Sequence, residues 1–142
     1  MRIMGLDIGE KRIGIALSDP MGWTAQGHSV LKRQEISLDL QKIKQICLEY
    51  DVEKIVIGFP RNMDGTIGSK ALEVQDLGQT IATELNLPVE YWDERLSTKS
   101  AERILIAADM SRRRRKQVID KMAAVGILQA YLDHLDSTSR NI

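Results

Sequence analysis

The order of short apolar runs and longer amphipathic segments constrains the fold of this chain more than any other feature. Apolar runs of about four to eight residues bounded by turn residues are typical of strands. Three such runs come first, and two more then alternate with segments of helical period. The predicted strands are 2–8, 13–18, a stretch between Thr24 and Leu31, 54–58 and 89–92.

Helices are predicted in the segments between and after the later strands. Apolar residues that recur every three or four positions indicate one buried face of a helix. The predicted helices are 36–50, about 69–86 with Ser69 as its cap, a segment from Thr98 to Ala108, and about 116–135. Antiparallel strands followed by strands that alternate with helices imply an α/β fold, in which helices flank a mixed sheet.

The chain length suits one compact domain. The 142 residues contain no internal repeat or linker, and we expect a single domain at 1–136 followed by a flexible C-terminal tail at 137–142. No apolar run approaches the roughly 18 residues that cross a bilayer. The first apolar run is short and already acidic at Asp7, which is unlike a signal peptide. A cytoplasmic protein is therefore expected.

The cysteine and histidine content excludes several kinds of site. Cys47 is the only cysteine, so an internal disulfide and a thiolate metal cluster are both excluded. Its apolar helical neighbours predict a buried thiol. His28 and His134 are far apart in sequence and share no motif, which gives little reason to regard them as metal ligands.

Charge is balanced overall but concentrated in one segment. The chain has 20 basic and 20 acidic residues, which counts mildly against a nucleic-acid binder. Between Ser111 and Lys121, however, six basic residues face the single acid Asp120, a local charge of +5. The run Arg112, Arg113, Arg114, Arg115 and Lys116 could bind phosphates, or it could be an ordinary solvated surface.

Two acidic positions stand where predicted strands end. Asp7 lies between Leu6 and Ile8 in an apolar strand, where a carboxylate costs free energy unless hydrogen bonds or a cation stabilise it. Asp93 and Glu94 close the last strand, either as a local cluster at a helix entry or as metal ligands. If the strands that end there run parallel to the first strand, all these acids share one sheet edge, where open α/β sheets place their sites.

A third acid lies in the last predicted helix. Ala123, Ala124 and Ile127 follow Asp120 at spacings of three, four and seven residues, so Asp120 belongs to a small, apolar stripe. The alternative is a position at the edge of this stripe, paired with Lys116 or Lys121. The small residues would let the helix approach the sheet closely.

Acids from three distant segments at one edge suit a pair of divalent cations. Hard oxygen ligands favour Mg²⁺ or Mn²⁺. Two such ions about 4 Å apart can activate water and stabilise the leaving oxygen of a phosphodiester. The residues therefore favour a metal-dependent nuclease.

Four motifs resemble one known family, the YqgF family, which is also called RuvX. Each motif is weak alone, but four in this order are specific, and the resemblance runs from Arg2 to about Asp133. The motifs are Met4–Gly9 with Arg12–Ala16, Gly58–Pro60 with Asn62–Gly65, Asp93–Thr98, and Ile119–Ala124 with Ile127–Gln129.

The resemblance implies an RNase H-like fold with a five-stranded sheet. It implies that Asp7, Glu94 and Asp120 form the catalytic and metal-binding site, with Asp93 as a substitute for Glu94. It also implies a nuclease that acts on structured nucleic acid, by processing the 5′ end of pre-16S rRNA or, alternatively, by resolving Holliday junctions. Its partners would be pre-rRNA or branched DNA, and the chain would act as a monomer or a homodimer.

Two other functions remain open at this point. Asp7-Ile8-Gly9 also resembles the first phosphate loop of actin-like ATPases, although those proteins use two such domains and this chain supplies one. A non-catalytic nucleic-acid binding module is the second. The loop at 62–68 could contact substrate or be a simple turn, and Trp23 and Trp92 are expected to pack in the core.

Overall fold

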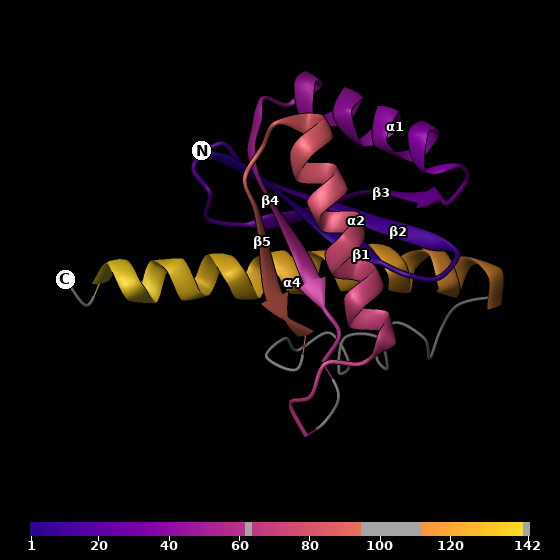
Figure 1. The fold of residues 1–142 in the computed structure, drawn as a ribbon. Helices are drawn as coiled ribbons and strands as arrows, with labels where there is room; N and C mark the ends of the chain where they lie inside the picture. Colours follow the sequence, from indigo (N-terminus) through magenta and orange to yellow (C-terminus); the bar gives the residue numbers. More distant parts are fainter. Residues whose placement is uncertain (62–63, 95–111, 141–142) are drawn as a thin grey trace.

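A single mixed sheet forms the centre of the molecule (Figure 1). The computed structural model describes residues 1–61, 64–94 and 112–140, and in the last range it describes side chains from Lys121 to Asp136. The strands are β1 (Arg2–Ile8), β2 (Arg12–Ser18), β3 (Ala25–Lys32), β4 (Val52–Phe59) and β5 (Val89–Asp93). They lie in the order β3-β2-β1-β4-β5.

The strand directions confirm the predicted mixed sheet. β1, β2 and β3 pair antiparallel, whereas β4 is parallel to both β1 and β5. The carboxyl ends of β1, β4 and β5 therefore lie at one edge. The predicted strand boundaries are confirmed to within a few residues, although only β1, β2 and β4 are mostly buried, whereas β3 and β5 are partly exposed.

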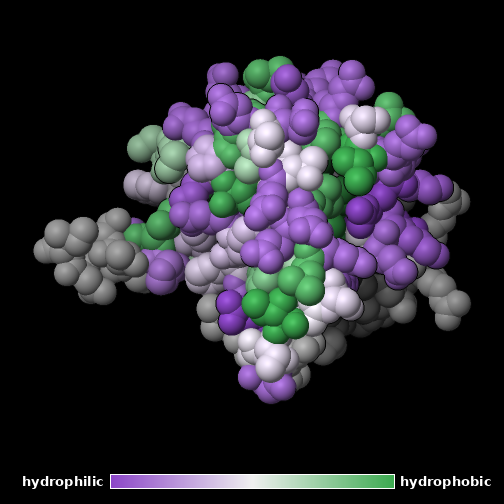
Figure 2. All heavy atoms as spheres, viewed as in Figure 1, coloured by the Kyte–Doolittle hydropathy of each residue, from purple (hydrophilic) through white to green (hydrophobic). Residues whose placement is uncertain are grey.

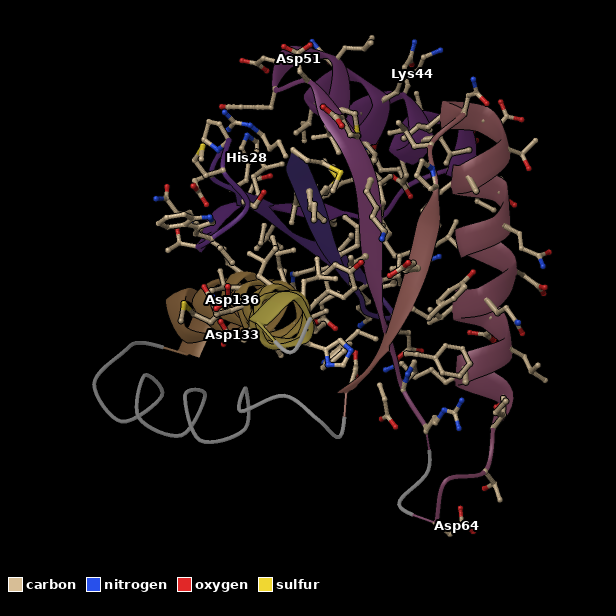
Figure 3. The ribbon with its side chains drawn as sticks, turned by 90° about the vertical axis from the view of Figure 1, so that its left-hand side faces the viewer. His28, Lys44, Asp51, Asp64, Asp133 and Asp136 are labelled. Atoms are coloured by element: carbon tan, nitrogen blue, oxygen red, sulfur yellow. The ribbon has the colours of Figure 1, made fainter. Side chains whose placement is uncertain are left out.

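Helices cover both faces of this sheet. α1 (Ile36–Glu49) and α2 (Ser69–Leu85) lie on one face, and the long helix α4 (Arg112–Arg140) lies on the other (Figure 3). Side chains alternate along β1: Met4, Leu6 and Ile8 belong to the core under α1 and α2, whereas Ile3 belongs to the core under α4. The predicted helix at 98–108 lies outside the described residues.

Two helix starts differ from the sequence-based expectation. Gly68, not Ser69, is the N-cap of α2, so Ser69 is already helical. α4 begins at Arg112, four residues before the predicted start at 116. Arg and Lys are good helix formers, so the basic run continues the helix rather than preceding it.

α4 packs closely on the sheet through glycines and alanines. Ala123 and Ala124 are fully buried, as their spacing predicted. A methyl group built on Gly5 would lie 2.7 Å from Leu128 Cβ and 3.2 Å from the Ala124 carbonyl oxygen. The helix therefore touches the backbone of β1 directly, which only glycine at this position permits.

A hydrogen-bonded cluster of Lys54, Glu90 and Tyr131 connects α4 to β4 and β5. Lys54 Nζ lies 2.8 Å from Glu90 Oε1 and donates to the Tyr131 hydroxyl at 2.6 Å, and that hydroxyl donates to Glu90 Oε2 at 2.6 Å. The hydrogen bond from Lys54 lowers the pKa of Glu90, and burial raises the pKa of Tyr131. The cluster fixes the position of the C-terminal half of α4.

The expectations for Cys47 and the tryptophans have mixed outcomes. Cys47 is buried on α1, and burial raises the pKa of its thiol to about 11. Trp92 packs against the α4 core as predicted, but Trp23 is 73% exposed, so the prediction for it was wrong. Trp23 lies in the turn between β2 and β3, where it lines an open pocket together with Leu132 and Leu135 of α4.

The outer surface over α1 and α2 is polar with separate hydrophobic patches (Figure 2). Leu38, Leu48 and Leu72 are among its exposed large apolar residues. Of the helices described, none combines the length and apolar character that crossing a membrane requires.

Candidate active site

Asp7 lies on the α4 face of β1, near the carboxyl end of the strand. Ile3 faces α4, and a side chain at Gly5 would also face it. Because alternate residues of a strand point to the same face, Asp7 lies on this face as well. Asp7 is only partly buried and is the register partner of Gly14 on β2. Its carboxylate therefore stands between the sheet edge and the helix.

Glu94 extends over Gly58 on the same face. A methyl group built on Gly58 would lie 2.6 Å from Glu94 Oε1 and 2.5 Å from Ile127 Cδ1. Because Leu6 pairs with Ile57, the next position along each strand brings Asp7 level with Gly58. The carboxylate of Glu94 thus lies over the strand next to Asp7, at the same height along the sheet.

The sequence analysis did not predict that position 58 must be glycine to leave space for Glu94. Any side chain at this position would occupy the space that Glu94 and Ile127 fill. The available signal was a glycine inside the β-branched run of 54–58, because a glycine in a strand often marks close approach of another group.

Alternation along β5 separates Asp93 from Glu94. Glu90 bonds Tyr131 of α4, and Trp92 packs in the core under α4, so the even-numbered positions of β5 face that helix. Asp93 pairs in register with Phe59, which belongs to the core under α1 and α2. Of the two acids, Glu94 is therefore the one on the face that carries Asp7.

The direction of α4 places its first half toward this edge. Ile127 contacts the position of Gly58 near the carboxyl end of β4, whereas Tyr131 bonds Lys54 near its amino end. α4 therefore passes from the carboxyl-terminal part of β4 toward its amino-terminal part, and it crosses β4 and β5 at a steep angle (Figure 3).

Asp120 lies on the part of α4 whose backbone alone is described. Ala124 lies over Gly5, and position 120 is one helical turn earlier, about 6 Å along the axis. Two residues of β1 advance by a similar distance, roughly 7 Å, from Gly5 to Asp7. The backbone of position 120 therefore precedes the contact with Gly5 by one helical turn, while its side chain lies outside the described set.

The donor set present at the edge fits a hard divalent cation. Asp7 and Glu94 both offer carboxylate oxygens, which Mg²⁺ and Mn²⁺ prefer. Among the side chains that the structure describes, no three His, Cys, Asp or Glu groups converge as a metal site. Asp120 is not among those side chains, so Asp7 and Glu94 are the two predicted ligands whose positions on the α4 face of the sheet the structure describes.

The loop after β4 projects beyond the same edge. Figure 3 shows Asp64 at the tip of this loop, past the ends of β4 and β5. Asp64 Oδ1 accepts hydrogen bonds from the Thr66 backbone N–H at 3.0 Å and its hydroxyl at 2.6 Å, and Gly65 has a φ of 90°. Asn62 and Met63, and with them part of the predicted 62–68 contact, lie outside the described residues.

The predicted basic contacts also precede the described side chains. Arg112, Arg113, Arg114, Arg115 and Lys116 occupy the first turns of α4, and only their backbone is described. They stand four to eight positions before Asp120 on the same helix.

Comparison with known proteins relates the whole domain to a nuclease family. The sequence model of the RuvX family, described as "Holliday junction resolvase", matches residues 1–134. A protein of Syntrophomonas wolfei subsp. wolfei is 64% identical over 133 residues, covering 94% of each chain. One of Bacillus subtilis is 53% identical over 138 residues, covering 96% of this chain and 100% of its own. Both bear the name "Putative pre-16S rRNA nuclease".

Solved resolvase structures share the fold. Thermus thermophilus RuvC, in complex with a Holliday junction substrate, aligns with a TM-score of 0.64 at 13% identity, covering 96% of each chain. The fowlpox virus resolvase, in complex with junction DNA, aligns at 0.59 and 12% identity, covering 95% of this chain and 99% of its own. At these identities the likeness concerns the fold, which is the RNase H-like fold that the sequence predicted.

Proposed function

The chain belongs to the RuvX family, and from this membership we propose that it is a metal-dependent endonuclease that processes the 5′ end of pre-16S rRNA. One observation supports the site most strongly: the carboxylate of Glu94 lies over Gly58 on the face and at the height of Asp7. Relatives more than half identical that are named for this substrate support the choice of RNA. A cytoplasmic location fits this role.

In the proposed site, Asp7, Glu94 and Asp120 hold Mg²⁺ or Mn²⁺. When bound, a pair of these ions supplies water activation and stabilisation of the negative charge that develops on the phosphodiester. The contribution of the protein is to hold the carboxylates in a fixed arrangement. β1 fixes Asp7, Gly58 leaves space for Glu94, and the packing of α4 on Gly5 sets the height of position 120.

The basic run would hold the substrate backbone. Arg112 to Lys116 are four to eight residues before Asp120, so on a helix they extend about 6–12 Å beyond it. Cations at that distance suit phosphates that flank the cleaved bond, and such contacts position a substrate without reading its sequence.

We expect Gly58→Ala to reduce cleavage by about a hundredfold while the protein still folds. The added methyl group would meet Glu94 Oε1 and Ile127 Cδ1, both ends of flexible side chains that can move aside. Displacing a metal-binding carboxylate by about 1 Å can cost this much in rate. Cleavage rates of the purified variant measure the effect.

Gly27→Ala is the matched control. Its methyl group would meet the flexible side chain of Lys121, at 2.5 Å from Cδ, where α4 crosses β3. This change disturbs α4 packing similarly but displaces no carboxylate. Equal cleavage rates for the two variants would refute the proposal that Gly58 leaves space for a metal-binding Glu94.

Holliday junction resolution is the second candidate, and the family description favours it. Incubation with precursor rRNA and with four-way junction DNA, each with Mg²⁺ or Mn²⁺, separates the two. We expect cleavage of the RNA near the 5′ end of the mature sequence at a rate well above any junction cutting. Paired, symmetric cuts in the junction, which usually require a dimer, would instead identify a resolvase.

A further inference from the structure

A cavity lies across the end of β1 from Asp7, on the face of α1 and α2. Its volume is about 560 Å³, within the range of roughly 300–1,000 Å³ that is usual for small-ligand sites. It is bounded by Ile8, Gly9, Glu10, Arg33, Gln34, Ser69, Lys70, Glu73, Val74 and Leu77. The end of β1, the turn after it, the end of β3 and the first turns of α2 thus supply its walls.

The guanidinium of Arg33 is held at this cavity by the turn after β1. Arg33 Nη1 donates to the Gly9 carbonyl oxygen at 2.9 Å, and the Arg33 backbone N–H donates to the Lys11 carbonyl oxygen at 2.9 Å. Arg33 is partly buried, so its charge stays at one place relative to Gly9. A guanidinium fixed in this way is suited to an anionic group such as a phosphate.

The other polar groups make the cavity mixed in charge. Lys70 adds a second cation, but Glu10 and Glu73 add two carboxylates, and Gln34 adds an amide. The two carboxylates oppose the binding of a bare phosphate, which the cations alone would favour. A nucleotide matches both kinds of group, since its phosphate binds cations while its base amines and ribose hydroxyl groups donate to carboxylates.

The apolar part of the wall suits a base. Ile8 and Val74 are 6% and 3% exposed and belong to the core, and Leu77 packs against it. They form the apolar part of the lining beside the charged groups. A partly open cavity of this size admits one extruded nucleotide, whereas a base pair within a helix would not fit into it.

The cavity lies close to the proposed cleavage site. Gly9 follows Asp7 by two residues, roughly 7 Å along the chain. A strand with one phosphate at Asp7 and Glu94 could therefore continue over the sheet edge into the cavity. We infer that this cavity binds one unpaired nucleotide of the substrate strand, next to the cleaved bond. This inference rests on the proposed function. It adds that the enzyme selects single-stranded segments of its substrate.

Binding of a labelled single-stranded 12-mer RNA, measured by fluorescence anisotropy without divalent metal, tests the inference. We expect the 12-mer to bind more tightly than a blunt duplex of the same sequence. Lys70→Glu should weaken binding of the single strand about tenfold and flatten its salt dependence. Lys70 is exposed, so thermal unfolding should be unchanged.

Lys44→Glu is the matched control. Lys44 is also an exposed lysine on a helix, and Figure 3 shows it at the opposite end of the molecule from Asp64 and the carboxyl edge. It should change binding less than twofold. Equal weakening by the two variants would overturn the inference, because the effect would then be one of net charge.

Competition separates a nucleotide from a phosphate. Adenosine monophosphate should displace the labelled strand at a concentration at least tenfold below that needed for inorganic phosphate. Equal competition by both, or duplex binding as tight as single-strand binding, would overturn the assignment. Cleavage measured on the same preparations distinguishes the two proposals. If the protein cleaves RNA but Lys70→Glu binds the single strand as tightly as the wild type, only the cavity proposal is refuted. If Lys70→Glu weakens binding but the wild-type protein does not cleave, only the nuclease proposal is refuted.

Discussion

Asp7→Asn is expected to slow cleavage of precursor rRNA by about a thousandfold, equivalent to roughly 4 kcal/mol in activation free energy. Asparagine keeps the shape of the side chain but removes the negative charge that would hold the cation. Asp7 is only partly buried and asparagine keeps its hydrogen-bonding oxygen, so the fold should be retained. Thermal unfolding without metal should occur at the same temperature or higher.

Substrate binding should be preserved in this variant. The proposed phosphate contacts come from the first turns of α4 and from the cavity beyond Gly9, and Asp7 supplies none of them. Anisotropy measured without metal should change less than twofold. Cleavage at the wild-type rate would refute the assignment of Asp7 to the site.

Glu94→Gln and Asp93→Asn extend the test to the end of β5. Glu94 lies on the face of Asp7, whereas strand alternation puts Asp93 on the other. We therefore expect the first change to reduce cleavage as strongly as Asp7→Asn and the second to have a small effect. The reverse order would exchange the roles of these two residues.

Gly5→Val is the change expected to damage stability most, by about 3 kcal/mol or more. Even one methyl group at this position would come within 2.7 Å of Leu128 Cβ and 3.2 Å of the Ala124 carbonyl oxygen. These atoms belong to the body of α4 and can move only if the helix moves. Urea unfolding followed by circular dichroism measures the loss.

Cleavage should fall together with stability in Gly5→Val, because a displaced α4 also displaces position 120. Gly27→Val provides the comparison, since α4 meets β3 there through the flexible side chain of Lys121. It should cost less than half as much stability. A Gly5→Val protein as stable as the wild type would mean that α4 does not rest on β1.

Much of the fold follows from local patterns in the sequence. The strands were predictable because buried runs such as 2–8 and 54–58 are short, apolar and bounded by turn residues. The parallel arrangement of β1, β4 and β5, assumed for the site, follows from the crossover helices between them. That topology was sufficient to bring Asp7 and Glu94 to one edge.

What was not predictable depends on contacts between distant segments. The space that Gly58 leaves for Glu94, and the cluster of Lys54, Glu90 and Tyr131, join segments 36 to 77 residues apart. No local period encodes such pairs. The choice between Asp93 and Glu94 required the face of β5, which became clear only from its partners on α4.

The most direct test of the account is the anomalous scattering of Mn²⁺ in crystals of the wild-type protein soaked at a concentration that supports cleavage. A peak coordinated by carboxylate oxygens of Asp7, Glu94 and Asp120 is the predicted result. Full Mn²⁺ occupancy at another position, with none among these three side chains, would contradict it.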